Sequence, residues 1–148
     1  MFKNILVATD GSDLAEKVMS HALGLAKIHA AKITAITVTE AWSAVEIAHD
    51  VRAGQKDPVG HYEGQAAKAA KSILDKAAKS AQLQGVACEI LHVHDQHPAE
   101  GIVATASNIG ADLIVIGSHG RRGLSRLLLG SQTYEVVTNC KVPVLVIR

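Results

Sequence analysis

Short apolar runs alternate along this chain with longer segments in which apolar residues recur every three or four positions. The runs are rich in valine and isoleucine, and they cover residues 2–9, 31–39, 86–93, 112–117 and 142–147. Such runs are typical of buried β-strands. The segments with a helical period cover residues 13–29, 63–84, 98–109 and 134–139. Strands that alternate with helices predict an α/β fold, with parallel strands and with helices on both faces of one sheet.

Capping and breaking residues mark the ends of several predicted helices. Asp13-Leu-Ala-Glu16 has the pattern of a capping box, so we expect the first helix to begin with Asp13 in the cap position. Pro98 occupies the place of a first helical residue. Gly85 and Gly110 are suited to end the two helices that precede them.

Residues 40–61 show no clear period. Three residues of the kind that break helices interrupt the segment: Gly54, Pro58 and Gly60. Because the segment is longer than an ordinary connection, it predicts a functional or mobile loop, with Trp42 and Val45 tucked beneath it. A short helix over residues 41–49 is the alternative.

A glycine-rich segment joins the fourth apolar run to the last helical segment. It reads Gly117-Ser-His-Gly120-Arg-Arg-Gly123-Leu-Ser-Arg-Leu-Leu-Leu-Gly130-Ser131-Gln132-Thr133. A loop that leaves a buried strand and ends at a helix N-terminus offers an anion free N–H groups and the positive end of the helix dipole. Its glycines let the backbone approach a phosphate closely and adopt positive φ. Ser131 could cap the helix or donate to a phosphate oxygen.

The same loop carries cations, a histidine and a run of leucines. Arg121, Arg122 and Arg126 suit bidentate contacts with phosphate, and we expect one or two of them to make such contacts rather than form only a solvated face. His119 could contact phosphate or hydrogen-bond the loop backbone. The leucines at positions 127–129 are expected to anchor the loop on the core.

The glycines of this segment have a specific spacing. Gly117 is followed after two residues by Gly120, which is followed after nine residues by Gly130 and Ser131. This spacing resembles the nucleotide-binding signature of the universal stress protein family. The resemblance covers essentially all 148 residues, because it extends to both ends of the chain: Ile5-Leu-Val-Ala-Thr9-Asp10-Gly-Ser12 and Val142-Pro-Val-Leu-Val-Ile147. The Walker pattern and the dinucleotide pattern GxGxxG are both absent.

The resemblance implies a doubly wound, five-stranded parallel sheet in the order 3-2-1-4-5, which is the adenine nucleotide alpha hydrolase-like fold. In that order the switch point lies between strands one and four, and ligands bind there, outside the carboxyl ends of the strands. Asp10 and Gly117 both lie at such ends. By resemblance Asp10 is a ribose or metal partner, although Asp-Gly-Ser is also ordinary turn chemistry. The backbones of Ala8 and Val38 would border the adenine.

ATP is the ligand that the resemblance implies, with Mg²⁺ or Mn²⁺ bridging its phosphates. The residues expected around it are Ala8, Thr9, Asp10, Val38, Ile116, Gly117, His119, Gly120, Arg121, Arg122, Gly130, Ser131, Gln132 and Thr133. No Ser-His-Asp triad, no paired carboxylates and no evident general base accompany the loop, which favours binding over turnover. We therefore expect a regulatory ATP-binding protein that acts on an unidentified protein partner. A slow ATPase and a non-nucleotide interaction protein are the alternatives.

Composition and charge narrow the other possibilities. A chain of 148 residues with 48% hydrophobic residues suits one globular domain, residues 1–148. A net charge of +1 and only 3% aromatic residues argue against nucleic-acid or membrane partners. Cys88 and Cys140 are expected to be separate structural thiols, with a disulfide as the alternative. Because no apolar segment has the length of a membrane span or a signal peptide, we expect a cytoplasmic protein.

Two further patterns remain open. His92, His94 and His97 form an HxHxxH pattern, which could ligate zinc or could consist of solvated and core-edge histidines. The last apolar run, residues 142–147, would be an edge strand and carries no charge. An apolar edge invites pairing with another chain, which predicts a homodimer along this strand; the family resemblance implies the same dimer.

Overall fold

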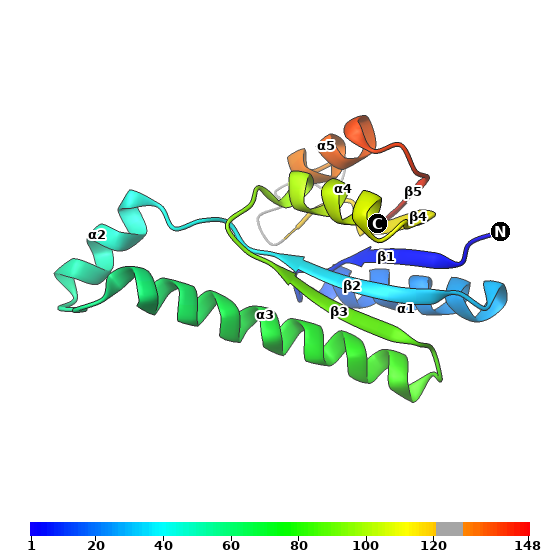
Figure 1. Cartoon of the computed structure of the whole chain (residues 1–148), viewed down its shortest axis with the longest axis horizontal. Helices are drawn as coiled ribbons and strands as arrows, with labels where there is room; N and C mark the ends of the chain where they lie inside the picture. The colour runs from blue at the N-terminus through cyan, green and yellow to red at the C-terminus, as the bar shows by residue number, and fades with distance from the viewer. Residues whose placement is uncertain (121–128) are drawn as a thin grey trace.

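A parallel sheet of five strands lies at the centre of the fold. Its strands are β1 (Asn4–Ala8), β2 (Lys32–Val38), β3 (Cys88–Val93), β4 (Leu113–Gly117) and β5 (Val144–Ile147). The computed structural model describes residues 1–120 and 129–148, and within them the strand order is β3-β2-β1-β4-β5 (Figure 1). Ile5 of β1 pairs with Ile33 of β2 on one side and with Leu113 of β4 on the other. The predicted order 3-2-1-4-5 is confirmed.

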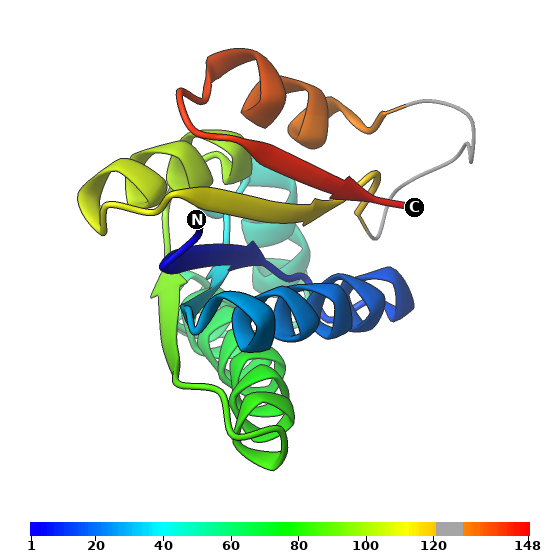
Figure 2. The same cartoon turned by 90° about the vertical axis from the view of Figure 1, so that its right-hand side faces the viewer.

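Helices cover both faces of the sheet. They are α1 (Asp13–His29), α2 (Ala44–Arg52), α3 (Pro58–Leu83), α4 (Pro98–Asn108) and α5 (Ser131–Asn139). Side chains alternate along β1, so Ile5 and Val7 join the core that α1 and α3 cover, and Leu6 joins the core beneath α4 and α5. Figure 1 shows α4 and α5 on one side of the sheet and α1 and α3 on the other, and Figure 2 shows the same layers after a quarter turn. The doubly wound arrangement is therefore confirmed.

The segment predicted as a loop forms two helices instead. Ser43 caps α2 through a capping box, in which its Oγ accepts from the N–H of Glu46 and the carboxylate of Glu46 accepts from the N–H of Ser43. Asp57 caps α3 by accepting from the N–H of Gly60 at 3.0 Å, and Pro58 is the first helical residue. Proline at that position has no hydrogen bond to lose, so it starts the helix rather than breaking it.

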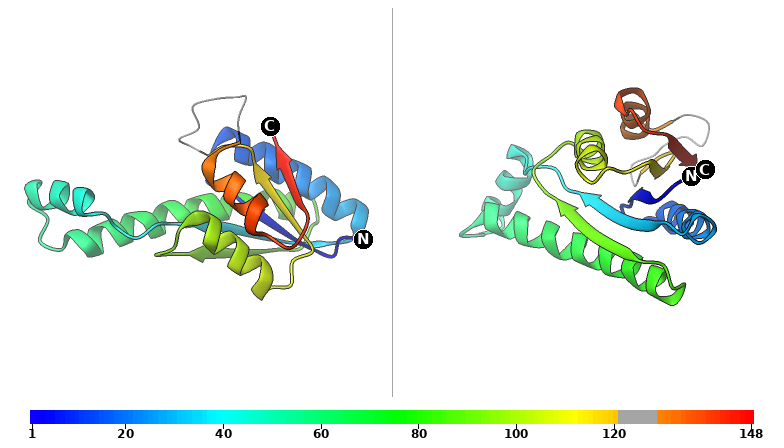
Figure 3. Two further views of the ribbon diagram at one scale, coloured as in Figure 1. Left: turned by 90° about the horizontal axis from the view of Figure 1, so that it is seen from above. Right: turned by 45° about the vertical axis from the view of Figure 1, so that its right-hand side comes forward.

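The start of α3 and all of α2 extend beyond the end of the sheet (Figure 3). Helix α2 has no buried residue. Trp42 and Val45, which were predicted to lie beneath a loop, are 44% and 79% exposed. That prediction is wrong, because the segment is helical and stands away from the sheet. The alternative of a short helix near residues 41–49 is closer, with its bounds shifted toward the C-terminus.

Other boundaries agree with the sequence to within a few residues. Pro98 is the first residue of α4. Gly85 and Gly110 follow the ends of α3 and α4 with φ of 68° and 62°, the left-handed conformation that favours glycine. β5 begins at Val144 rather than at residue 142, since Pro143 has no N–H to donate to the ladder.

Both cysteines are free thiols and partly buried, so the disulfide alternative is not realised. Burial raises the pKa of the Cys88 thiol, which keeps it in the unreactive, protonated form. Across the described ranges, no helix combines the length and the apolar character that crossing a membrane requires.

Candidate functional site

A pocket of about 1210 Å³ lies at the carboxyl ends of β1, β2 and β4. Every described residue that the sequence assigned to the ligand lines it: Ala8, Thr9, Asp10, Val38, Ile116, Gly117, His119, Gly120, Gly130, Ser131, Gln132 and Thr133. Arg121, Arg122 and Arg126 lie outside the described residues. The fold thus brings the segment after β1 and the glycine-rich segment together at the switch point. That these residues contact a ligand stays a prediction.

Hydrogen bonds fix the rim of the pocket. The N–H of Thr9 donates to the carbonyl of Ile36 at 2.9 Å, and the buried hydroxyl of Thr37 donates to the carbonyl of Thr9 at 2.8 Å. The hydroxyl of Thr133, also buried, donates to the carbonyl of Gly117 at 2.7 Å. The first two bonds tie the end of β1 to β2, and the third ties the start of α5 to the end of β4. The backbone around the pocket is therefore held in place before any ligand arrives.

The motif glycines serve close packing and not positive φ. None of Gly117, Gly120 and Gly130 has positive φ, and Gly130 has φ −61° and ψ 152°. A β-carbon on Gly130 would lie 3.3 Å from the Cα of His119 and 3.3 Å from the carbonyl oxygen of Ser118. Both are backbone atoms, which cannot rotate away. The expectation of positive φ is wrong for these three residues, and the expectation that the backbone approaches a phosphate closely stays a prediction.

The other two motif glycines leave room for neighbouring side chains. A β-carbon on Gly117 would lie 3.0 Å from Cδ2 of Leu14, and one on Gly120 would lie 3.3 Å from Oδ2 of Asp10. Gly120 therefore allows the carboxylate at the end of β1 to approach the backbone of the glycine-rich segment. A β-carbon at this position would require the Asp10 carboxylate to shift by a few tenths of an ångström.

Helix α5 begins at the pocket without a side-chain cap. Gly130 is its N-cap, and Ser131 is its first helical residue, so the alternative in which Ser131 caps the helix is wrong. The first turn of α5 contains no acidic residue. The helix therefore does not neutralise the positive end of its own dipole, which suits an anion in the pocket.

Asp10 has the turn contact expected of its sequence and also faces the pocket. Its Oδ1 accepts from the N–H of Ser12 at 3.0 Å, which closes the turn after β1. Ser12 in turn caps α1 by accepting from the N–H of Ala15, so the capping box that was assigned to Asp13 is wrong by one residue. Because one carboxylate oxygen forms the turn while the side chain lines the pocket, both interpretations of Asp10 remain compatible.

Two further described residues of the loop, His119 and Leu129, differ in their surroundings. His119 lines the pocket, and its Nδ1 lies 3.1 Å from the hydroxyl of Ser118. It can therefore keep a contact within the loop while it faces a ligand. Leu129 is 40% exposed, so it does not anchor the loop on the core, and Leu127 and Leu128, which were expected to do the same, lie outside the described residues.

The histidine pattern near the end of β3 does not converge on one point. Nε2 of His92 lies 2.8 Å from the hydroxyl of Thr39, and Nδ1 of His94 lies 3.0 Å from Oδ2 of Asp95. His97 contacts α5 instead. Partial burial, and to a smaller extent the nearby His94, lower the pKa of His92. Within the described part of the chain, no three His, Cys, Asp or Glu side chains are arranged to hold a metal ion.

Sequence reasoning missed a second wall of the pocket, which α2 and α3 supply. Six of its residues are Glu46, Tyr62, Gln65, Ala66, Ala69 and Ile73. The hydroxyl of Tyr62 donates to the carbonyl of Glu40 at 3.3 Å, which ties α3 to the chain leaving β2. Two local signals could have revealed this wall: the Ser-x-x-Glu capping box at residues 43–46 and the Asp-Pro helix start at residues 57–58.

A polar contact holds α2 against α3. Nδ1 of His61 donates to Oδ2 of Asp50 at 2.8 Å, and Nδ1 of His49 lies 3.6 Å from Oδ1 of Asp50. The hydrogen bond from His61 holds the pKa of Asp50 below its ordinary value. A lowered carboxyl pKa contributes stability above the unfolded-state pKa, and this stability is lost as the pH falls through the folded-state value.

We expect α2 to loosen from α3 on acidification below the ordinary aspartate pKa of about 3.9, as the pH falls through the lowered pKa of Asp50. Trp42, the one tryptophan of the chain, lies just before α2 and reports the change by its fluorescence. The measurement is a step in Trp42 emission at a pH where far-ultraviolet circular dichroism is still unchanged. Asp50→Ala should abolish the step. His49→Ala is the matched control, because its ring is 82% exposed, and it should keep the step. An Asp50→Ala protein with an unaltered step would contradict this role for Asp50.

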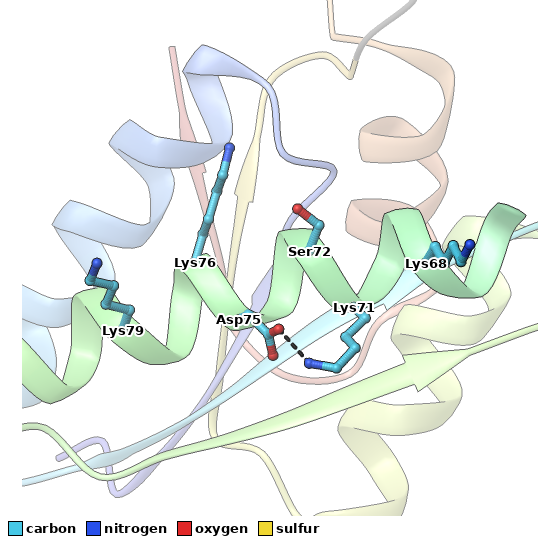
Figure 4. A pocket seen from close by; sticks show the side chains of 6 residues that line it. All are labelled: Lys68, Lys71, Ser72, Asp75, Lys76 and Lys79. Atoms are coloured by element: carbon cyan, nitrogen blue, oxygen red, sulfur yellow. Dashed lines mark hydrogen bonds and ion pairs between the residues drawn. The ribbon is translucent and has the colours of Figure 1, made fainter.

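A second depression, of about 410 Å³, lies on the outer face of α3 (Figure 4). Its lining comes from α3 alone and consists of Lys68, Lys71, Ser72, Asp75, Lys76 and Lys79. Lys71 forms an ion pair with Asp75 four residues along the helix. The depression shares no residue with the pocket at the strand ends, and its side chains are those of an ordinary solvated helix face.

Comparisons with known proteins agree with this arrangement. The model of the universal stress protein family matches residues 1–148. Universal stress protein MJ0531 from Methanocaldococcus jannaschii is 34% identical over 148 residues, which cover 100% of this chain and 83% of that protein. Universal stress protein YxiE from Bacillus subtilis is 32% identical over 149 residues, and the match covers 100% of both chains.

Solved structures show the same fold. The structure of the MJ0577 protein, which is from Methanocaldococcus jannaschii, has a TM-score of 0.81 at 28% identity and covers 99% of this chain and 96% of its own. A universal stress protein from Archaeoglobus fulgidus, solved in complex with dAMP, has a TM-score of 0.72 at 23% identity and covers 99% and 98%. The family match over the whole chain, together with relatives above 30% identity, is decisive: this chain belongs to the universal stress protein family.

Proposed function

We propose that this protein binds ATP in the pocket at the strand ends and that the bound nucleotide regulates docking to a protein partner. One observation carries the proposal. Gly130, where a β-carbon would press on the backbone of Ser118 and His119, forms the N-cap of α5, which has no side-chain cap, in a pocket at the switch point of a doubly wound sheet. That combination of close backbone approach, free N–H groups and helix dipole suits a phosphate chain.

Family membership supports the same proposal. The signature spacing of Gly117, Gly120, Gly130 and Ser131 is intact. The Archaeoglobus fulgidus structure with dAMP shares the fold, but at 23% identity it supports the fold alone. The proposal therefore rests on the pocket and the motif of this chain.

A divalent ion would fit this site in the way that Mg²⁺ usually binds beside nucleotides. Mg²⁺ keeps several waters and takes one or two carboxylates in addition to phosphate oxygens. Asp10 offers one carboxylate at the pocket, next to Gly120. We propose that Asp10 holds the hydrated ion, either Mg²⁺ or Mn²⁺, while the phosphates supply the other ligands. The ion would neutralise phosphate charge.

We expect the pocket to prefer ATP over GTP. Val38 and Ala8 lie at the ends of adjacent strands and line the pocket. Backbone donors and acceptors there would recognise the base edge, and a purine with the reversed pattern would leave buried groups unpaired. A displacement assay with labelled ATP should require at least about tenfold more GTP than unlabelled ATP, the effect of one unmatched hydrogen bond. Equal competition by the two nucleotides would contradict the expected preference for ATP.

The experiment that tests ATP binding directly is nucleotide analysis of the purified protein after denaturation. We expect an adenine nucleotide to be released and to be restored by incubation with ATP. A purified protein that releases no nucleotide and also shows no ATP binding by calorimetry would refute the proposal. Turnover of labelled ATP would then separate a binding protein from the slow ATPase.

We propose in addition that the protein acts in the cytoplasm as a homodimer joined along β5.

A further inference from the structure

The N-termini of α4 and α5 are capped in different ways. The N-cap of α5 is Gly130, which has no side chain, and the N-cap of α4 is His97, which makes no side-chain cap hydrogen bond. The N–H of Ala99, in the first turn of α4, donates instead to Oε1 of Gln132 at 2.9 Å. Gln132 belongs to the first turn of α5. Helix α4 is therefore capped by a side chain from the neighbouring helix.

One N–H of the Gln132 amide makes a second contact with the start of α4. Its Nε2 donates to Nε2 of His97 at 3.1 Å, while Nδ1 of His97 lies 3.6 Å from Oε2 of Glu135. The N–H of Ala99 requires the amide oxygen, so the amide nitrogen must face the histidine. Gln132 and Glu135 lie on α5, whereas His97 and Ala99 begin α4. The network joins the two helices at their pocket ends.

Both helices contribute to the pocket. Pro98 and Ile102 of α4 line it, as do Gly130 and Ser131 at the start of α5. The amide oxygen of Gln132 and one of its two N–H groups are bonded to the start of α4, while the expected contact of Gln132 with a nucleotide stays a prediction. Sequence alone could not reveal this, since the partners are more than 30 residues away along the chain.

We infer that Gln132 is a positioning residue, which sets the first turn of α5 against α4 and thereby places the α5 N–H groups that receive the phosphates. The expected effect on ATP affinity rests on the proposed function, whereas the positioning of α5 by Gln132 is independent of it. Two other bonds hold the start of α5 to the end of β4 and the residue after it, from Thr133 to Gly117 and from Gly130 to Ser118. Loss of Gln132 should therefore shift the turn rather than release it, and ATP affinity should fall by about tenfold.

A purely structural role is the competing explanation, because loss of a helix cap alone lowers stability. Two variants separate these explanations. One is the single variant Gln132→Ala, and the other is the double variant that combines Gln132→Ala with His97→Ser. His97 has the extended conformation of an N-cap, with φ −65° and ψ 132°, so serine there can cap α4 locally. The double variant should regain the thermal midpoint that Gln132→Ala loses, but not the contact with α5.

The matched control is Asn4→Ala. The amide of Asn4 donates to the carbonyl of Ile109 at the opposite end of α4, at 2.6 Å. This variant should lose stability without any change in ATP affinity. All proteins are compared by thermal midpoint, by ATP calorimetry, and by amide hydrogen exchange of residues 129–134 in the absence of nucleotide.

We expect faster exchange in residues 129–134 and about tenfold weaker ATP binding in both Gln132 variants. Unchanged exchange in Gln132→Ala would overturn the inference, and so would a double variant that regains affinity together with stability. A third outcome is that the wild type binds no ATP while exchange is still faster in both variants. That result would support the positioning of α5 by Gln132 and would refute the proposed function.

Discussion

A Gly130→Val variant is expected to lose at least about 100-fold in ATP affinity, equivalent to about 3 kcal/mol, the scale of one or two lost hydrogen bonds to a charged phosphate. A β-carbon at this position would already lie 3.3 Å from two backbone atoms, the Cα of His119 and the carbonyl oxygen of Ser118. Valine adds two methyl groups to that carbon. The backbone of the loop must then move away from Ser118, although the N–H of Gly130 donates to that carbonyl at 2.7 Å.

The loss should arise from space and not from backbone conformation. Gly130 has φ −61° and ψ 152°, which any residue can adopt. Overpacking of this kind costs about 1–3 kcal/mol, so the fold should survive. Gly130→Ala should fall between the wild type and the valine variant, because it adds the β-carbon alone.

Gly24→Val is the matched control for Gly130→Val. Gly24 is an exposed residue of α1, and a β-carbon there would meet nothing within 4 Å. The variant should change helix stability slightly and leave ATP affinity unaltered. A folded Gly130→Val protein that binds ATP as well as the Gly24→Val protein would remove this loop from the binding site.

Most of the fold could be predicted from the chain, because its central strands β1, β2 and β4 are buried on both faces. Ile5, Leu6 and Val7 are all fully buried, and such a run is apolar without alternation. The order of the strands came from the resemblance, since periodicity alone does not specify which strands are neighbours. Where prediction failed, over residues 40–61, Pro58 and Gly60 were counted as helix breakers although Asp57 makes them a helix start.

The site could be predicted as a set of residues but not as a set of contacts. Gly130 was identified by its spacing, whereas the reason for glycine, a backbone that passes beside Ser118, exists only in the folded chain. Gln132 was identified as part of the same motif, and its bond to Ala99 spans two helices. Local sequence carries the identity of such residues, and tertiary packing decides which atoms they face.

The second large effect is expected at the edge of the sheet, where we propose that two copies of the chain pair along β5. The sheet has two edge strands, β3 and β5, and they differ in charge. β3 carries Glu89, which forms an ion pair with Lys32, whereas β5 consists of valine, leucine and isoleucine. Charge protects an edge from pairing and its absence invites pairing, so a two-fold axis beside β5 would continue the sheet into a second copy. We expect sedimentation to show a dimer at micromolar concentration.

A charge placed in the centre of β5 should separate that dimer. Leu145 is 37% exposed, whereas Val146 packs against the core beneath α4 and α5, so Leu145→Lys disturbs the edge with less damage to the fold. A buried, unpaired ammonium group is costly, and the dimer should weaken by at least about 100-fold, equivalent to about 3 kcal/mol. Ile90→Lys on β3 is the matched control, because Ile90 is 44% exposed on the opposite edge. That variant should remain dimeric. A monomeric wild type would show that β5 is not an interface. The same conclusion would follow if Ile90→Lys dissociated the dimer and Leu145→Lys left it intact.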